Sequence, residues 1–323
     1  MTPQVNWFIP VNHRDYNQMP ASVWVRCLQL FPYLEKHGVR CTVNDRNADV
    51  DVAIFMRWQD EKAYKLAQEQ KQKGQRIIFD LCVNYFDETG LFQGGYGSTK
   101  ERVREAARMV DLADVVACAS EFIKQRASEF HPYTIYLPDS VDFDHFRFEK
   151  SCSDFDKPVL TVVWAGQSSK TVELADLYPL LARRRIPLIV ISEKKPSLPG
   201  PYTYMPWSYH TFPRAILSGE LCIAPRRTDN PYDLGHSHFK IGIFMAQGVP
   251  ALASPLPSYV EVIGKTGAGR ICDSEVSWES AIDKALEDRH MLKEWSKAAR
   301  QGMLVYSTES IAQKYMQLFK DIK

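Results

Sequence analysis

Short apolar runs alternate with longer segments of helical periodicity along the entire sequence of 323 residues. Parallel strands need long crossover connections, which are usually helices, so this alternation is typical of a parallel sheet covered by helices. The sequence therefore predicts an α/β fold. The predicted strands comprise residues 5–9, 39–43, 51–55, 76–81, 114–119 and 133–137 in the first half, then 159–164, 188–192, 221–224, 250–254 and 270–272. The predicted helices comprise residues 22–37, 61–73, 99–112 and 121–130, then 171–184, 209–217, 237–247, 258–264, 278–286 and a long C-terminal stretch.

The series of predicted elements is interrupted once, at residues 148–157, which are polar, lack periodicity and lead into a proline. A chain of this length exceeds one hydrophobic core of ordinary size. We therefore predict a Rossmann-like domain over residues 1–150 and a second one over residues 151–323. Ligands of such sheets bind at the carboxyl ends of the strands, so we expect the site in a cleft between the two domains.

Composition excludes several classes of partner. The 40 Lys and Arg residues nearly balance the 39 Asp and Glu residues, so no global field attracts nucleic acid or an anionic membrane, and any phosphate site must be local. The seven cysteines show no metal-binding spacing and are interpreted as reduced thiols. The start of the sequence lacks a signal peptide, and no apolar run is long enough to span a membrane. We expect a cytoplasmic protein without a metal or cofactor, and weak peripheral membrane association stays open.

The most informative segment covers residues 225–254. It is interpreted as the end of a strand, a polar loop, a helix beginning near Ser237, a tight turn and another strand. We expect the loop at 233–236, including His236, to present free backbone N–H groups together with the positive end of the helix dipole. Ser237 and His238 can donate hydrogen bonds there, and Lys240 can bring a charge onto a phosphate. The segment therefore predicts an anion site.

Further residues near this segment extend the prediction. Arg226 and Arg227, at the end of the preceding strand, could close the other side of the anion site. The alternative for all these residues is a capped surface helix with solvated charges. Gly248 follows the helix and predicts a left-handed C-terminal residue. Glu261 lies early in the next helix, where it either binds a ribose diol or stabilises the helix without a ligand.

A base near an acceptor hydroxyl is predicted at strand ends of the first half. The candidates are His13 and Asp15, in the loop after the first strand, and Asp80, at the end of the fourth. For each of them a loop hydrogen bond or a helix cap is the alternative.

The sequence resembles the GT-B glycosyltransferases, specifically the family 4 group, over nearly its whole length. Residues 245–254, 259–263 and 267–269 resemble the donor-binding run of that family, and residues 164–170 resemble the glycine turn that opens its C-terminal domain. Residues 116–121 and 137–142 resemble a strand and the interdomain passage of the same group. The order and spacing of these motifs agree with the family as well.

The resemblance implies a function for several residues. Gly166 would let the backbone approach the donor phosphates, and Lys240 would contact the diphosphate. Glu261 would lie near the nucleotide or sugar, and the last helix, about 307–319, would cross back onto the N-terminal domain. The remaining donor-binding residues implied by the matched motifs are Gln167, Lys170 and Tyr259. The sequence departs from the family at Gly235 and Ile243, where many retaining members carry two glutamates.

Together these features predict a glycosyltransferase that moves a sugar from a nucleotide-diphosphate donor to a glycan, lipid-linked or small-molecule acceptor, independently of metal. Stabilisation of the leaving diphosphate is the chief demand on such a protein, and the cations and the helix dipole can meet it. Retaining or inverting chemistry stays open. The alternatives are a nucleotide-sugar 2-epimerase on the same fold and a non-catalytic two-domain binding protein.

Overall fold

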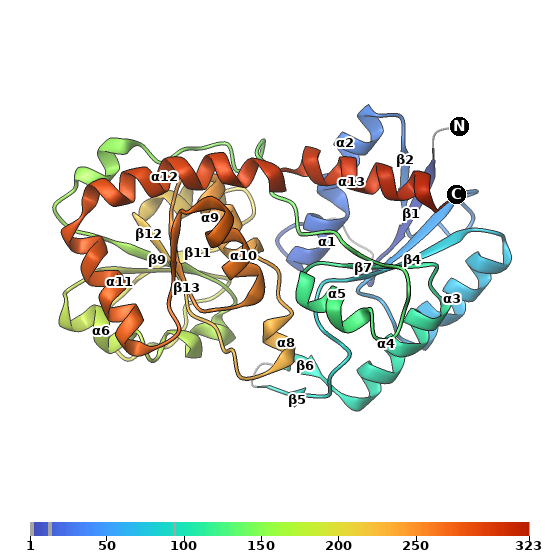
Figure 1. The fold of residues 1–323 in the computed structure, drawn as a ribbon, viewed down its shortest axis with the longest axis horizontal. Helices are drawn as coiled ribbons and strands as arrows, with labels where there is room; N and C mark the ends of the chain where they lie inside the picture. The colour runs from blue at the N-terminus through green and yellow to red at the C-terminus, as the bar shows by residue number, and fades with distance from the viewer. Residues whose placement is uncertain (1–2, 12–14, 93–94, 323) are drawn as a thin grey trace. The chain divides into compact units, whose positions relative to one another are not determined.

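The computed structural model describes residues 3–11, 15–92 and 95–322. Its chain forms two compact units (Figure 1). The first unit comprises Met1–Ser140, Asn230–Ser237 and Tyr306–Lys323, and the second comprises Val141–Asp229 and His238–Val305. The predicted boundary near residue 150 lies inside the second unit. Residues 230–237 belong to the first unit, although they follow most of the second in sequence.

The first unit contains a parallel six-stranded sheet in the order β2-β1-β3-β4-β7-β8. Its strands are β1 Gln4–Phe8, β2 Arg40–Val43, β3 Val52–Met56, β4 Arg76–Leu81, β7 Val115–Cys118 and β8 Thr134–Tyr136. All six were predicted within two residues of these bounds, because buried parallel strands form the continuous apolar runs that the sequence displays. The two-residue strands β5 Gly90–Leu91 and β6 Gly97–Ser98 were not predicted.

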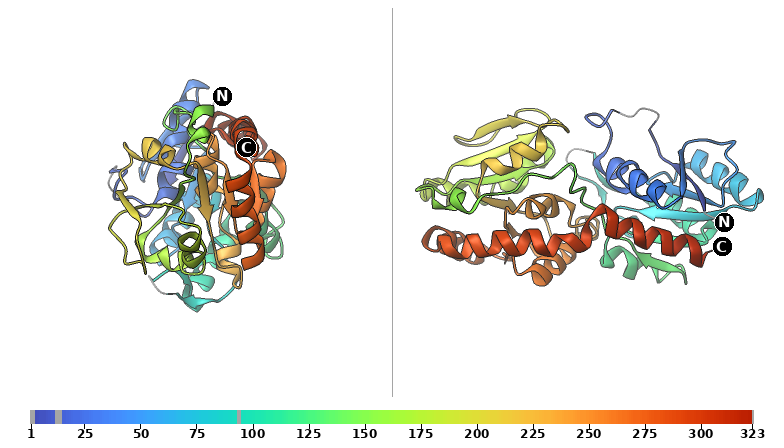
Figure 2. Two further views of the ribbon diagram at one scale, coloured as in Figure 1. Left: turned by 90° about the vertical axis from the view of Figure 1, so that its left-hand side faces the viewer. Right: turned by 90° about the horizontal axis from the view of Figure 1, so that it is seen from above.

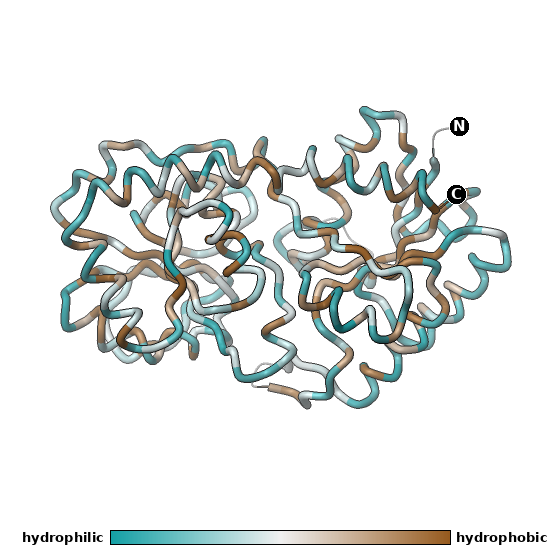
Figure 3. The backbone as a smooth tube through the Cα atoms, in the orientation of Figure 1, coloured by the Kyte–Doolittle hydropathy of each residue, from teal (hydrophilic) through white to brown (hydrophobic). Residues whose placement is uncertain are grey.

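Helices cover both faces of this sheet (Figure 2). On one face Phe8, Phe55 and Phe79 pack with side chains of α3 Glu61–Gln72, α4 Lys100–Leu112 and α5 Glu121–Ala127. On the other face Trp7 packs against Phe31 of α2 Phe31–Lys36 and against Phe319 of α13 Thr308–Asp321. The apolar residues are concentrated along the strands (Figure 3). Helix α13 therefore completes the core of the first unit, although it comes from the end of the chain.

The single helix predicted over residues 22–37 was wrong. The segment forms α1 Ala21–Arg26, the 3-10 helix η1 Leu28–Leu30 and α2. Cys27 lies outside the helical region at φ −131° and ψ −79°. Pro32 explains the break, because its ring would clash with the carbonyl of residue 28 in a continuous α-helix. The helix predicted over residues 171–184 is divided in the same way, into η3 Ser168–Leu174 and α6 Tyr178–Arg183.

The second unit also contains a parallel six-stranded sheet, in the order β11-β10-β9-β12-β13-β14. Its strands are β9 Val162–Ala165, β10 Leu188–Ser192, β11 Thr203–Pro206, β12 Leu221–Ala224, β13 Ala251–Ala253 and β14 Gly269–Ile271. Only β11 was not predicted. The predicted α/β fold with two Rossmann-like sheets is therefore confirmed.

The helices of the second unit likewise divide between two faces. One face carries η2 Cys152–Asp156, η3, α6 and α11 Glu275–Glu287, which pack around Trp164 and Val190. The remaining helical segments are α7 Phe212–Ala215, η4 Ile216–Ser218, α9 Phe239–Ala246, α10 Pro257–Thr266 and α12 Arg289–Met303. Among these, α9 packs against α12. Gly248, just after α9, has φ +78°, which confirms the predicted left-handed residue.

Candidate functional site

The strand order of the second unit directs attention to the carboxyl ends of β9 and β12. The chain passes from β9 to β10 on one side and returns to β12 on the other, which makes a topological switch point between β9 and β12. Ligands of open α/β sheets bind at such points. Gly166 directly follows β9, and Arg226 lies two residues after β12. Both predicted residues therefore lie where the topology places a ligand.

A buried carboxylate connects two of the predicted cations at this point. Glu173, from η3, forms an ion pair with Arg226, in which Oε1 lies 2.9 Å from Nη1. The other carboxylate oxygen of Glu173, Oε2, lies 3.8 Å from Lys240 Nζ. The side chains of Arg226 and Glu173 are each 2% exposed, whereas that of Lys240 is 18% exposed. Two cations around one anion leave a net positive charge, and the Lys240 side chain is the less enclosed of the two, although its Nζ atom is itself buried. Arg226 is enclosed and pairs with Glu173.

Trp164 and Gly166 form the surroundings of the lysine. Lys240 Nζ lies 4.8 Å from the centroid of the Trp164 ring, within the range of a cation–π interaction. A Cβ added at Gly166 would lie 2.8 Å from the Trp164 ring and 3.3 Å from Lys240 Nζ. Glycine is therefore required at this turn, because any side chain would displace the indole or the lysine.

The glycine turn is fixed to the neighbouring strand by Glu193, which follows β10. Its carboxylate accepts hydrogen bonds from the backbone nitrogen of Ser168 at 2.9 Å and from the Ser168 hydroxyl at 2.6 Å. Partial burial raises the pKa of Glu193, but these hydrogen bonds outweigh burial and lower it below its usual value. The carboxylate therefore stays ionised and holds the turn in place.

The loop predicted at residues 233–236 is helical over its first two residues. Residues Pro231–Leu234 form a short helix, α8, capped by the side chain of Asn230, which accepts from the nitrogen of Asp233 at 2.8 Å. The backbone nitrogens of residues 234, 235 and 236 donate to carbonyls of residues 230, 231 and 233. These N–H groups already donate hydrogen bonds within one helical turn, so they are not the free donors expected for an anion site. The positive end of α9, which begins at Phe239, stays near Lys240.

The histidines and the serine of this segment have different positions. His236 Nδ1 lies 3.1 Å from the carbonyl oxygen of Tyr232, and His238 is fully buried. Ser237 belongs to the first unit, where its hydroxyl donates to Asp139.

The remaining donor-binding predictions fall on several elements of the second unit. Arg227 and Gln167 are exposed, and Lys170 is half-buried in η3. Tyr259 is buried in α10. In the same helix Glu261 accepts from Lys265 at 2.7 Å, the i,i+4 spacing of an ordinary helix pair, which agrees with the stabilising role that was its alternative.

The three candidate bases also differ in position. His13 lies outside the described residues. The carboxylate of Asp15 accepts from the nitrogen of Asn17 at 2.9 Å and from the Gln18 amide at 2.6 Å, as a loop-forming aspartate does. Asp80 is fully buried. A buried carboxylate with occupied oxygens is not placed to take a proton from an acceptor, and a structural role explains Asp80 better.

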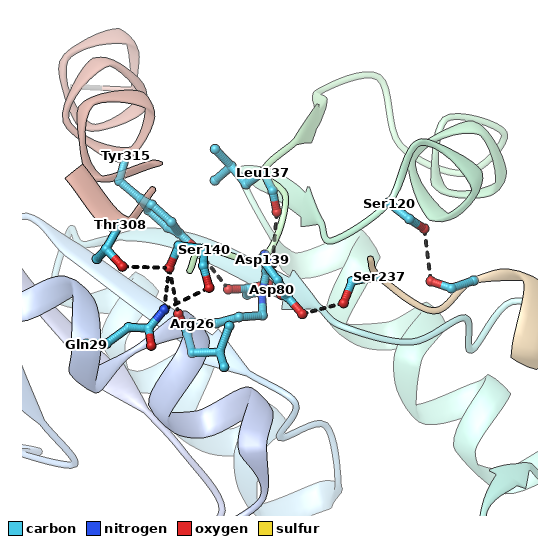
Figure 4. Close-up of polar contacts among 12 residues, drawn as sticks. Arg26, Gln29, Asp80, Ser120, Leu137, Asp139, Ser140, Ser237, Thr308 and Tyr315 are labelled. Atoms are coloured by element: carbon cyan, nitrogen blue, oxygen red, sulfur yellow. Dashed lines mark hydrogen bonds and ion pairs between the residues drawn. The ribbon is translucent and has the colours of Figure 1, made fainter. Parts of the chain in front are cut away.

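Asp80 belongs to a buried network around Arg26 of α1 (Figure 4). Arg26 reaches the Asp80 carboxylate at 2.7 Å, the Asp139 carboxylate at 2.8 Å and the carbonyl of Leu137 at 2.8 Å. The Tyr315 hydroxyl of α13 donates to the other oxygen of Asp80 at 3.1 Å. Burial raises the pKa of Asp80 and the Arg26 guanidinium opposes the rise, while burial and the charge of Asp80 raise the pKa of Tyr315. Tyr315 therefore stays protonated and donates.

A second layer of this network surrounds Ser140. Its hydroxyl accepts from the Gln29 amide at 2.5 Å and lies 3.5 Å from the Thr308 hydroxyl (Figure 4). Ser120 donates to the carbonyl of Gly235 at 2.9 Å. The segments at 137–140, 230–237 and 306–308 are thus bound to the body of the first unit by polar contacts.

Many retaining members of the family carry glutamates at two positions of this region. The present sequence has no carboxylate at either of them, because they are Gly235 and Ile243. A Cβ added at Gly235 would lie 2.8 Å from Cβ of Asn84, so a side chain does not fit there without a shift of the Asn84 loop. Ile243 is buried in α9.

Sequence reasoning missed Glu173, Glu193, Arg26 and Asp139. The only signal for Glu173 was indirect, because a buried arginine such as Arg226 needs a carboxylate partner. Neither spacing nor periodicity indicates which carboxylate that is.

Two general searches complete the description. Among the described residues, no cluster of His, Cys, Asp and Glu has the arrangement of a metal site. No helix in the described ranges has the length and apolarity needed to cross a membrane.

No protein-family model matches the sequence, and no curated protein matches it. Solved structures do match. The structure of sucrose-phosphate synthase from Thermosynechococcus elongatus has a TM-score of 0.75 at 11% identity and covers 99% of each chain. The Anabaena protein Alr3699/HepE, in complex with UDP and glucose, has a TM-score of 0.69 at 12% identity, covering 99% of this chain and 100% of its own.

A glycosyltransferase from Rickettsia africae ESF-5 has a TM-score of 0.70 at 12% identity and covers 99% of this chain and 98% of its own. The match extends over both units. At such low identities the likeness concerns the fold, and it agrees with the resemblance in the sequence: the chain has the GT-B fold of these glycosyltransferase structures.

Proposed function

We propose that this protein is a glycosyltransferase that moves a sugar from a nucleoside-diphosphate donor bound by the second unit to a hydroxyl acceptor bound by the first. One observation carries the proposal: Lys240, in the first turn of α9, is held by Glu173 and Trp164 at the switch point of the second sheet. The fold shared with HepE, which was solved in complex with UDP-glucose, supports a nucleotide sugar as donor. UDP-glucose is the first donor to test.

In the proposed reaction the bond between the anomeric carbon and the diphosphate oxygen breaks, and the acceptor oxygen forms a bond to that carbon. The electron pair of the broken bond stays on the diphosphate, where negative charge grows, and the acceptor proton passes to a base or to the departing phosphate. Lys240 and the positive end of α9 stabilise the growing charge. They supply what a metal ion supplies in metal-dependent transfer, so we propose transfer without one.

The ion pair of Arg226 with Glu173 determines the net charge around Lys240. Without Arg226, Glu173 would neutralise Lys240 and repel the diphosphate. Because Arg226 occupies the other oxygen of Glu173 at 2.9 Å, one positive charge is left for the ligand. Gly166 keeps the space beside Lys240 open to the phosphates.

The test is a titration of UDP against the wild-type protein and Lys240→Met. Charge-assisted hydrogen bonds contribute about 1.5–3 kcal/mol, so we expect the Kd for UDP to rise about 10- to 100-fold. Lys284→Met removes a lysine that is 52% exposed on α11 and serves as the matched control with unchanged affinity. Equal affinities of wild type and Lys240→Met would contradict the phosphate role.

A second measurement addresses the reaction. Labelled UDP-glucose is incubated with and without mixed acceptors, and the products are separated. We expect a labelled glycoside that depends on the acceptor. An isomerised nucleotide sugar formed without acceptor would contradict the proposal.

A further inference from the structure

Arg57 lies at the switch point of the first sheet. The strand order places β1 between β2 and β3, so the chain leaves β1 toward one side and continues with β3 on the other. Arg57 is the first residue after β3, and its backbone nitrogen donates to the carbonyl of Asp80 at 3.2 Å. It thus occupies, in the first unit, the kind of position that Gly166 and Arg226 mark in the second.

The backbone of Arg57 is strained. Its φ is +54°, in the left-handed region that residues other than glycine rarely adopt. Two other described non-glycine residues share this feature, Asn44 and Arg185, and asparagine tolerates it well. A glycine would make the turn at residue 57 without strain. The arginine side chain is therefore present at a cost in stability, a condition typical of functional positions.

The surroundings of Arg57 are rich in hydrogen-bonding groups but lack an acid. Its guanidinium donates to the Ser22 hydroxyl at 3.3 Å, and Tyr85 is a further hydrogen-bond partner. Within the described part of the chain it forms no ion pair with a carboxylate, in contrast to Arg26. The residue is exposed to solvent, while its guanidinium lies close enough to the protein for burial to act on its pKa.

Two buried tyrosines lie near Arg57. Tyr85 and Tyr232 are each 6% exposed, and both interact electrostatically with Arg57. The Tyr232 ring packs against Phe92 at 6.3 Å and Tyr96 at 6.0 Å between ring centroids. Burial lowers the pKa of Arg57, but Cys82 and the two tyrosines outweigh it and raise the pKa above its usual value. The guanidinium therefore stays charged.

We propose that Arg57 binds a phosphate group of the acceptor, with the hydroxyls of Ser22 and Tyr85 as neighbouring hydrogen-bond partners. A carboxylate needs only the planar fork of one arginine, whereas donors from three elements suit a tetrahedral phosphate. That the ligand is an acceptor rests on the proposed function. Binding of the phosphate group at Arg57 does not depend on the proposed function.

The first experiment measures the melting temperature with inorganic phosphate, against acetate at the same ionic strength, in the presence of saturating UDP. UDP occupies the second unit, so the remaining effect of phosphate reports on the first. We expect a phosphate-dependent rise in Tm for wild type and for Lys240→Met, and none for Arg57→Gly. Arg46→Ala, which removes another exposed arginine of the first unit, is the matched control and keeps the response.

Arg57→Gly also separates a binding role from a packing role. Without phosphate its Tm does not fall below that of wild type, because glycine relieves the strain at φ +54°. A Tm several degrees lower, or a phosphate response equal to that of wild type, would overturn the proposal. A failure of UDP to bind would refute the proposed function, while the comparison of Arg57→Gly with Lys240→Met would still decide this inference.

The source of the phosphate is distinguished by titrating a hexose 6-phosphate and a short-chain isoprenyl phosphate separately. Arg57→Gly is expected to weaken at least one of them about 10-fold or more, the loss of one charge-assisted contact. Weakening of the first identifies a sugar phosphate, and weakening of the second identifies a lipid phosphate. If neither ester binds wild type better than Arg57→Gly, the proposal fails.

Discussion

Burial of single residues decides which charged or titratable groups of this protein can respond to their surroundings. His145 stacks on Tyr209 with ring centroids 4.0 Å apart and an angle of 10° between the planes. Burial lowers its pKa from 6.5 to about 4, so the folded protein keeps this histidine neutral through most of the acid range. The same effect separates the side chain of Lys240, which is 18% exposed, from that of Arg226, which is 2% exposed.

We predict that His145 makes the protein less stable as the pH falls from about 6.5 toward about 4. The unfolded chain takes up the proton near pH 6.5 and the folded chain only near pH 4, so the unfolded state binds more protons in this window. The expected loss is on the order of 3 kcal/mol. His145→Phe keeps the stacked ring and should flatten the dependence of the free energy of unfolding on pH. Equal slopes for wild type and His145→Phe would contradict the prediction.

Helices and strands were largely predictable because their signals are local. Buried strands form apolar runs, and a glycine after a helix marks its end, as at Gly248. The errors occurred where a local feature was overlooked. Proline breaks two predicted helices, and Asn230 caps a short helix in what was expected to be a loop. The strand β11 contains a proline and only four residues, which makes its signal weak.

Two glycine-to-alanine substitutions should have opposite effects on stability. Gly248 has φ +78°, and an added Cβ would lie 2.8 Å from the Ser296 hydroxyl, so Gly248→Ala should cost about 1–2 kcal/mol. Gly264 lies in α10 with nothing within 4 Å of an added Cβ, so Gly264→Ala should stabilise by up to about 1 kcal/mol. Urea unfolding measures both. Shifts of the same sign would refute this account.

At the scale of the whole molecule, the first unit is assembled from three separate parts of the chain. Residues 230–237 join it through the contacts of Gly235 with Ser120 and of Ser237 with Asp139. Residues 306–323 join it through the contacts of Thr308 with Ser140 and of Tyr315 with Asp80 (Figure 4). Removing one partner of a buried ion pair leaves an uncompensated charge, which is strongly destabilising. The network around Arg26 is therefore expected to determine how firmly these segments stay in the first unit.

Arg26→Met should destabilise the first unit by about 3–5 kcal/mol, because Asp80 and Asp139 lose their cation while buried. Arg184→Met is the matched control in the second unit. Its partners Asp283 and Glu279 are more than 40% exposed, so the expected cost is below about 1 kcal/mol. Two spectroscopic probes, one in each unit, would follow urea unfolding. A loss confined to the second unit, or equal losses for both variants, would contradict the role of Arg26.

The sequence by itself determined the α/β class and eleven of the twelve strands of the two large sheets within three residues at each end, and it indicated Gly166 and Lys240 as donor-binding candidates. These follow from periodicity, turn residues and motif order, which are properties of neighbouring residues. Only the tertiary structure decided that Glu173 joins Arg226 to Lys240, that Asp80 is buried by Arg26, and that Arg57 stands strained at a switch point. Those pairings depend on which strand ends become neighbours, and on which of many carboxylates lies within a few ångströms of each buried cation. A linear pattern contains no such distances.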